Sequence, residues 1–313
     1  QMRIGVLRDY SVQRIVFAYS EGSYNVFGDT TQFATLLPSE FVELSVTAGN
    51  LISLKVGVNE VAIVSKVVLV ATKLNNSLVY STKIPAVKER KYKDDVEITV
   101  VNGALTIVNL VDMNNYLSGV VESEGGGGKE IEYYKVQALM SRTYALKYKT
   151  RHQKEGFDLC DRTHCQAYHH QLRLNPIIDS AVLKTEGMVM VDQHGHLVDA
   201  YFHANCGGQT CEPQDVWNEP IGGLASFRDT FCVHTQQATW VKSIPLQTWN
   251  SFLEKNYNFP LSDSMSVALM QEFRQPVRSA FYLHPVYGIP LRDLRDQFKL
   301  KSTFFDAVIV DQQ

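Results

Sequence analysis

Residues 112–128 read Asp-Met-Asn-Asn-Tyr-Leu-Ser-Gly-Val-Val-Glu-Ser-Glu-Gly-Gly-Gly-Gly and predict a short amphipathic helix with sharp limits. Asp112 is a candidate N-cap, and the glycine run that follows Glu124 ends the helix. A carboxylate there lies at the negative end of the helix dipole, which disfavours its charged form and suits a general acid. The other interpretation is an ordinary solvated glutamate. The apolar stripe at helical spacing consists of Tyr116, Leu117, Val120 and Val121.

The residues before this helix have the pattern of β-strands. Alternating or β-branched runs predict strands over residues 2–7, 14–19, 41–46, 51–56 and 61–71. Turns are expected at Gly22-Ser23, Gly49-Asn50 and Asn75-Asn76. The strongest hairpin signal is Asn102-Gly103, between residues 96–101 and 104–108.

Helices and a second hairpin are expected after this point. A mostly apolar stripe predicts a helix over residues 132–149. A hairpin is expected from residues 188–191 and 197–203, and helices over residues 246–257 and 265–273. The fold class is therefore α+β. We expect a β-rich domain over residues 1–95, a catalytic core over residues 96–235 and a C-terminal α/β segment over residues 236–313.

Five ordered elements resemble the SpoIID/LytB family, which includes the sporulation-stage lytic transglycosylase of bacterial peptidoglycan. The first is Tyr-Leu-Ser-Gly-Val-Val-Glu-Ser-Glu at residues 116–124, and the second is Val-Gln-Ala-Leu-Met-Ser-Arg-Thr-Tyr-Ala-Leu at residues 136–146. Residues 158–168, 200–210 and 294–305 are similar to three further family elements, and Asp215-Val216-Trp217 stands where the family has Asp-Val-Trp. The resemblance implies a mixed helix/hairpin catalytic domain of the SpoIID type.

The resemblance also implies a reaction, cleavage of the bond between N-acetylmuramic acid and N-acetylglucosamine to give 1,6-anhydro ends. One carboxylate suffices, because the sugar's own C6 hydroxyl replaces water, so Glu124 would act first as general acid and then as base. Arg142 and Thr210 match family positions implied to bind or orient glycan, and Tyr116 could stack on a sugar. Arg142 could instead be a surface salt-bridge partner, and Tyr116 a core residue.

The chain departs from the family pattern at several places. Gly125 to Gly128 replace a Met-Pro segment, and Gly222-Gly223 with Ala225 stand where Pro-Tyr-Leu-Lys is common. The loss of an aromatic and a cation keeps a second function open, a non-catalytic wall-binding protein that modulates an amidase. A third is a zinc-stabilised structural or dimerisation module, so a homodimer is a possible state.

Two chemistries compete for the first cysteine pair. Cys160, His164 and Cys165, with His152 upstream, supply four ligands that suit tetrahedral zinc. The four-residue spacing departs from the usual Cys-x2-Cys, but family members with this segment resemble zinc binders. In an oxidising compartment these thiols could instead form a disulfide. The chemistry itself is expected to need no cofactor, so any zinc would be structural.

The three remaining cysteines suggest a second cross-link. Cys206 and Cys211 are a candidate disulfide that would tie a glycine turn to the following loop. Cys232 is then left over and is expected to be a buried, unpaired thiol.

Composition excludes little. A chain of 313 residues with 45% hydrophobic and 20% charged residues can bury a large core, and its net charge of −3 argues against a nucleic-acid partner. No apolar run is long enough to span a bilayer, and no signal peptide is visible. Because the family acts on the cell wall, we expect an exported protein with its signal removed and with peptidoglycan strands as its partner.

Overall fold

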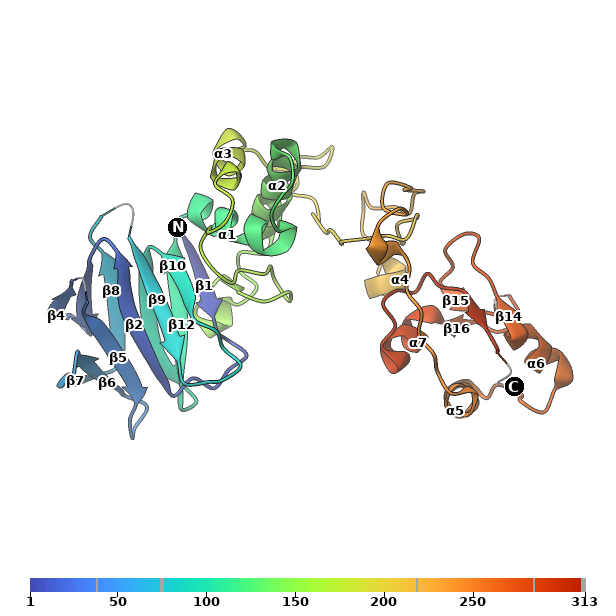
Figure 1. Ribbon diagram of the computed structural model, residues 1–313, viewed down its shortest axis with the longest axis horizontal. Coiled ribbons are helices and arrows are strands. Elements are labelled where there is room, and N and C mark those ends of the chain that lie inside the picture. The colour runs from blue at the N-terminus through green and yellow to red at the C-terminus, as the bar shows by residue number, and fades with distance from the viewer. Residues whose placement is uncertain (38, 74–75, 218, 284, 311–313) are drawn as a thin grey trace. The chain divides into compact units, whose positions relative to one another are not determined.

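The computed structural model describes residues 1–37, 39–73, 76–217, 219–283 and 285–310, and these form two compact units. The first unit covers Gln1–Tyr201 and the second covers Phe202–Gln313, and each is described by itself (Figure 1). Asn75 of the expected turn and the side chain of Trp217 lie outside the described part of the chain. The division expected after residues 95 and 235 stays a prediction.

Two β-sheets build most of the first unit. In one, the neighbouring strands are β13 (Leu159–Cys160), β1 (Met2–Val6), β12 (Ala104–Val111), β11 (Asp95–Val101), β8 (Lys66–Ala71), β3 (Tyr24–Gly28) and β4 (Thr31–Leu36). In the other they are β10 (Arg90–Lys93), β9 (Ser77–Thr82), β2 (Arg14–Glu21), β5 (Phe41–Val46), β6 (Ile52–Val56) and β7 (Asn59–Val64). Alternate residues of both sheets are buried in a single hydrophobic core.

Local sequence signals place several of these strands correctly. Asn102 and Gly103 both have positive φ, 52° and 74°, and join β11 to β12 as the hairpin signal predicts. The single strand expected over residues 61–71 is wrong, because the chain changes sheets there. Asp29 Oδ1 accepts hydrogen bonds from the amides of Ser65 and Lys66, at 3.1 Å each, and interrupts the run between β7 and β8.

Three helices pack together in the first unit: α1 (Met113–Gly125), α2 (Ile131–Lys147) and α3 (Ile177–Lys184) (Figure 1). The carboxylate of Asp112 accepts the amide of Asn114 at 2.8 Å and so caps α1, as predicted. Gly126, with φ of 66°, ends this helix. The α+β class is confirmed, and α2 ends at Lys147, two residues before the predicted limit.

The hairpin expected over residues 188–203 is reduced to one antiparallel bridge between Val191 and Leu197. Its turn forms, with Gly195 at φ of 81°. Two backbone hydrogen bonds cross the hairpin, from the amide of Asp192 to the carbonyl of His196 at 2.8 Å and from the amide of Val198 to the carbonyl of Met190 at 3.2 Å. The ladder does not continue at Met190, because its amide donates to the hydroxyl of Thr143 at 3.0 Å.

The second unit is smaller and has a core of its own, centred on buried residues of three of its helices. Its elements are α4 (Gln214–Trp217), α5 (Leu246–Tyr257), α6 (Ser264–Gln271), β14 (Glu272–Phe273), β15 (Phe281–Tyr282), β16 (Ile289–Pro290), α7 (Leu291–Phe298) and β17 (Ala307–Val308). The helix at residues 246–257 forms as predicted. The helix expected over 265–273 ends at Gln271, because Glu272 and Phe273 pair with β17.

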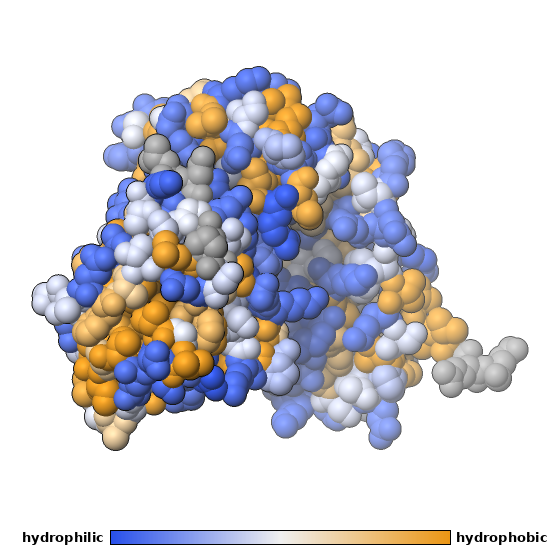
Figure 2. Space-filling view, turned by 60° about the vertical axis from the view of Figure 1, so that its left-hand side comes forward, coloured by the Kyte–Doolittle hydropathy of each residue, from blue (hydrophilic) through white to orange (hydrophobic). Residues whose placement is uncertain are grey.

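Surface hydrophobicity is uneven. The side of the first unit that carries β4 and β7 comes forward in Figure 2, where hydrophobic residues gather among polar ones. Val58, Val61 and Ile63, in and beside β7, are exposed. Within the described residues, no helix is both long and apolar enough to cross a membrane.

Candidate functional site

Glu124 lies in the last turn of α1, one residue before the helix ends in the glycine run. Its Oε1 accepts the backbone amide of Ala167 at 2.6 Å, so the carboxyl group is held against the loop that follows β13. The hydroxyl of Ser123 accepts the amide of His169 at 3.3 Å, which ties the same loop to the same helical turn. Glu124 remains partly exposed, as a group that donates a proton to a ligand must be.

The glycine turn beside Glu124 is tied at both ends by one side chain. The hydroxyl of Tyr134 in α2 donates to the carbonyl of Gly126 and accepts the amide of Lys129, at 3.1 Å each. The ring of Tyr133 packs against Gly125, where a Cβ would come within 3.0 Å of it. Two adjacent tyrosines of α2 therefore line the glycine turn, and sequence inspection did not single them out.

Two titratable side chains flank Glu124. Burial raises the pKa of Tyr133, and the nearby charges of Tyr134 and Glu124 raise it further. Burial and the Arg90 cation lower the pKa of His169, so this imidazole is neutral near pH 7. Both groups interact electrostatically with Glu124 and are uncharged near pH 7.

Glu122 has a different task from Glu124, as their two-residue spacing on a helix predicts. Its carboxylate accepts the amides of Arg173, Leu174 and Asn175, at 3.0, 2.8 and 3.2 Å. The side chain is only 8% exposed. Glu122 therefore anchors the loop before α3 and is not available as a second acid.

Arg142 lies in α2 with its guanidinium buried against the end of α3. Nη1 donates to the carbonyls of Thr185 and Met188, at 2.7 and 3.2 Å, and Nη2 donates to that of Val182 at 3.1 Å. Burial lowers the pKa of Arg142. These contacts cap α3 at its C-terminus. Arg142 therefore does not form the surface salt bridge that was one of its two expected roles. Its contact with glycan stays a prediction, and these hydrogen bonds do not support it.

Tyr116 and Thr210, the other two residues expected to bind glycan, lie in different units. Tyr116 is fully buried, and its hydroxyl bonds to Oε1 of Gln166 at 3.2 Å while its ring packs on Tyr168. Its place is in the core. Thr210 belongs to the second unit, where its hydroxyl accepts the amide of Phe227 at 2.8 Å. The predicted roles of both residues in glycan binding remain untested.

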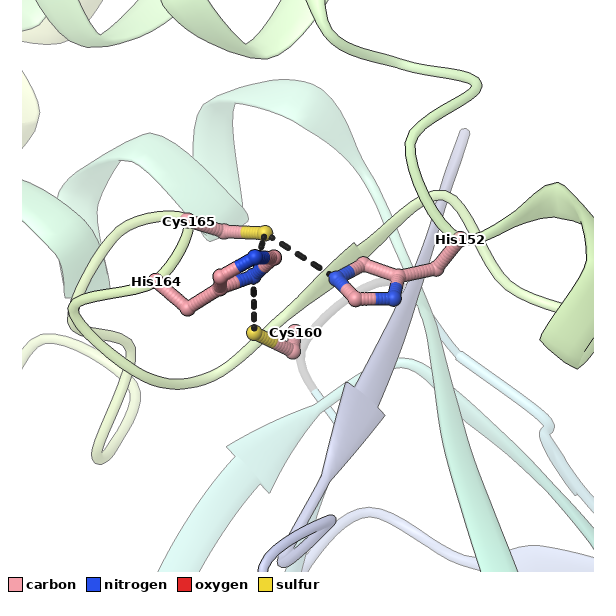
Figure 3. Close-up of side chains that lie close together, drawn as sticks. All are labelled: His152, Cys160, His164 and Cys165. Carbon is pink, nitrogen blue, oxygen red and sulfur yellow. Dashed lines mark hydrogen bonds between the residues drawn. The ribbon is translucent and has the colours of Figure 1, made fainter. Parts of the chain in front are cut away.

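The four side chains expected to bind zinc do come together (Figure 3). The Sγ of Cys165 lies 3.4 Å from Nε2 of His152 and 3.6 Å from Nδ1 of His164, and the Sγ of Cys160 lies 3.8 Å from the same Nδ1. All four ligand atoms lie within 4.8 Å of one another. Cys160 ends β13, His164 and Cys165 come from the loop after it, and His152 comes from the turn after α2.

These separations fit one tetrahedral ion. With zinc bonds of about 2.3 Å to sulfur and about 2.0 Å to nitrogen, a tetrahedral site places sulfur and nitrogen roughly 3.5 Å apart. The second ring nitrogen of His152 lies 2.6 Å from Oε1 of Glu155, the carboxylate contact that commonly orients a metal-binding histidine. Arg8 pairs with Glu155 at 2.8 and 3.0 Å and holds it in place.

The pKa values of the two thiols are shifted in opposite directions. A hydrogen bond from Cys165 lowers the pKa of Cys160, and the same contact raises the pKa of Cys165. The guanidinium of Arg151 adds positive charge beside them, since it bonds to the carbonyl of His164 at 2.8 Å. One thiolate is therefore already favoured at neutral pH, which suits metal binding.

The second cysteine group differs from the prediction. Cys206 does not pair with Cys211; its Sγ lies 3.3 Å from that of Cys232. Cys232 is a free thiol, as expected, but it is partly exposed rather than buried and lies beside Cys206, because its loop folds back onto the glycine turn after Cys206. Sequence spacing favoured the nearer cysteine, whereas the fold selected the one 26 positions away.

A comparison with known protein families matches the part of the chain that contains Glu124 and the four clustered ligands. Residues 101–191, from the end of β11 through the glycine turn and the four-ligand cluster, match the family model SpoIID, described as stage II sporulation protein. This match confirms the resemblance over these residues: the chain contains a SpoIID domain, which suggests a cell-wall-related role.

One relative is similar to this chain over about half of the chain's length. An uncharacterized protein of Brachyspira hyodysenteriae is 26% identical over 169 residues, which cover 54% of this chain. The chain covers 45% of that protein, so less than half of the relative is represented.

Proposed function

We propose that the protein is a lytic transglycosylase that cleaves peptidoglycan strands, with Glu124 as its single general acid and base. The observation that carries this proposal is the position of the Glu124 carboxyl group. It is partly exposed, fixed by the Ala167 amide on one oxygen, and bordered by a glycine turn that has no side chains to obstruct a polymer.

The reaction needs two proton transfers at one carboxyl group. The free oxygen of the Glu124 carboxyl group protonates the bridging oxygen between N-acetylmuramic acid and N-acetylglucosamine, and the bond breaks. The carboxylate then accepts the proton of the C6 hydroxyl as that oxygen attacks C1, which closes the 1,6-anhydro ring. Because the nucleophile belongs to the sugar, no second carboxylate is needed. Glu122 can therefore remain bound to three backbone amides without any loss to the reaction.

We further propose that His152, Cys160, His164 and Cys165 hold a structural zinc ion. Bound there, zinc would supply a cross-link between the turn after α2 and the loop after β13. Cys165 is two residues before Ala167, whose amide bonds to Glu124, so order in this loop bears directly on the carboxyl group. The protein would act outside the cytoplasm, where its glycan substrate is found.

A second function has an observation in its favour. Arg142 and Tyr116, two of the residues expected to bind glycan, are buried and bonded within the fold. A protein that binds the wall and modulates an amidase would need no reactive acid, and it would not need Arg142 or Tyr116 to hold a sugar beside Glu124.

Mass spectrometry of glycan strands separates the two functions. Purified protein is incubated with intact peptidoglycan and with strands from which the peptides have been removed, each with and without a cell-wall amidase. New anhydromuramyl ends without amidase support the transglycosylase. Unchanged strands, together with faster peptide release when amidase is present, would replace it with the modulator.

A further inference from the structure

Two cysteines far apart in the sequence meet in the second unit. The Sγ atoms of Cys206 and Cys232 lie 3.3 Å apart, closer than two sulfur atoms in ordinary contact. Cys206 is buried, whereas Cys232 is partly exposed. The pair is thus accessible from one side only, through Cys232.

Hydrogen bonds join the loop that contains Cys206 to the loop that contains Cys232 and so support the sulfur contact. Asn205, next to Cys206, donates to the carbonyl of Cys232 at 3.3 Å and to the hydroxyl of Thr235 at 2.8 Å. The amide of Asp229 donates to the carbonyl of Gly208 at 2.9 Å. Arg278 donates to the carbonyl of Cys206 at 2.8 Å. The two loops therefore keep the sulfur atoms together without a covalent bond.

We propose that Cys206 and Cys232 are a dithiol pair that closes into a disulfide by exchange with an external disulfide, such as that of oxidised glutathione or of a thiol oxidoreductase. The disulfide would link the glycine turn at Gly207 and Gly208 to the loop that contains Asp229. This pairing is independent of the proposed glycan chemistry, because it is argued only from contacts within the second unit.

The geometry sets the order of the exchange. The Cys232 thiolate attacks one sulfur of the external disulfide, which forms a mixed disulfide and releases one external thiolate. Cys206 then loses its proton to the carboxylate of Asp229, whose Oδ2 lies 3.3 Å from its Sγ, and attacks the sulfur of Cys232. The second external thiolate leaves. Two cysteine thiols are oxidised by two electrons, and one external disulfide is reduced.

The environment of Cys232 supports its place as the attacking group. Burial raises the pKa of Cys232, but a hydrogen bond from Cys206 and the amides of Cys206, Gly208 and Gly207 outweigh it, and the net pKa is lowered. Gly207 and Gly208 have φ of 72° and 105°, which turns successive amides toward one side, as in an anion-binding nest. Burial and the contact with Cys232 raise the pKa of Cys206 to about 11.

A metal ion fits this group less well. Asp229, Cys206 and Cys232 offer three ligand atoms in close proximity. Two thiolates on one tetrahedral zinc would lie roughly 3.8 Å apart, because each bond is about 2.3 Å long. The observed 3.3 Å is shorter and suits a thiol pair better.

Peptide mapping of the full chain tests the proposal. Protein is equilibrated in reduced or oxidised glutathione, remaining thiols are alkylated, and cross-linked peptides are identified by mass spectrometry. We expect a Cys206–Cys232 link in oxidised glutathione only, with a rise in the Tm of the second unit of roughly 10 °C. A Cys206–Cys211 link would overturn the proposal, and so would full alkylation of both thiols after oxidation.

Single variants test the order of attack. Cys206→Ser should trap glutathione on Cys232, because the second thiol is gone, whereas Cys232→Ser should leave Cys206 mostly free. Cys211→Ser is the matched control and should form the same link as the unaltered chain. A metal ion that protects Cys206 and Cys232 from alkylation under reducing conditions, and that is lost in Cys232→Ser, would overturn the disulfide.

Discussion

The backbone amide of Ala167 donates a 2.6 Å hydrogen bond to Oε1 of Glu124 and so joins the end of α1 to the loop after the cysteine and histidine cluster. Cys165, one of the four clustered ligands, precedes Ala167 by two residues. The position of the proposed acid therefore depends on a loop that a metal ion would order. Changes at the cluster should affect Glu124 although no ligand touches it.

Replacement of Glu124 should separate activity from stability. Glu124→Gln keeps an oxygen that accepts the Ala167 amide, so we expect a change in unfolding free energy within about 0.5 kcal/mol. The release of anhydromuramyl ends should fall about 10²- to 10⁴-fold, because the amide cannot donate an acidic proton. Strand analysis by mass spectrometry and thermal unfolding measure both. Full activity of the variant would remove Glu124 from its role.

Glu122→Gln is the matched control for that change. It weakens three hydrogen bonds from backbone amides to a charged acceptor, so we expect a loss of stability of about 1.5–3 kcal/mol. Activity per folded molecule should be retained. A large loss of activity at unchanged stability would assign the chemistry to Glu122.

Removal of the proposed zinc should loosen the first unit. We expect about one zinc ion per purified chain, and Cys160→Ser should lose it and lower the Tm by more than about 5 °C. Cys211→Ser, outside the cluster, should keep both the metal content and the Tm. Elemental analysis that finds no metal, with Cys160 and Cys165 joined in a disulfide, would contradict the metal site.

Arg142→Met should destabilise the protein, because three carbonyl groups at the end of α3 lose their donor. We expect a cost of about 2–4 kcal/mol in denaturant unfolding. Arg274→Met removes an exposed guanidinium and should cost less than about 0.5 kcal/mol. If the Arg142 variant is stable but binds glycan strands weakly, the residue has the role in glycan binding that the resemblance implies.

Gly119 is required where α1 passes the loop after Tyr168. An added Cβ would lie 2.4 Å from the carbonyl oxygen of His170 and 2.6 Å from the ring of Tyr168. We expect Gly119→Ala to cost about 1–3 kcal/mol. Gly127→Ala meets no atom within 4 Å and should be close to neutral, so equal losses in the two variants would rule out this steric account.

Stability should decline in mild acid through His170. Burial and the charge of Arg173 lower its pKa from 6.5 to about 4 in the folded state. Between these values the unfolded chain binds a proton that the folded chain does not, so stability falls as pH drops from 6.5 toward 4. After allowance for solvent exposure, we expect a loss of about 1 kcal/mol.

Urea unfolding at pH 7.5 and pH 4.5 checks this dependence. Over that interval, His170→Gln should lose about 1 kcal/mol less stability than the unaltered chain, because it lacks the titrating group. His196→Gln, which removes an exposed imidazole, is the control and should follow the unaltered chain. An identical pH dependence in all three proteins would show that His170 does not contribute.

The sequence by itself determined the features that depend on neighbouring residues. Asp112 caps α1, Gly126 ends it, and Asn102-Gly103 turn the hairpin, because each requires only the local backbone conformation of a few residues. The four clustered ligands were also identifiable, since three of them lie within six positions of one loop. The order of the family elements sufficed to recognise the SpoIID domain.

Only the tertiary structure decided which distant groups meet. Asp29 divides one apolar run into two strands of different sheets, Arg142 caps a helix some forty residues away, and Cys206 selects Cys232 over the nearer Cys211. Such contacts depend on how the elements pack, and spacing along the chain carries no record of that packing. Glu124 illustrates both cases. Its position at a helix end followed from neighbouring residues, but its hydrogen bond to Ala167 depends on how the distant loop folds.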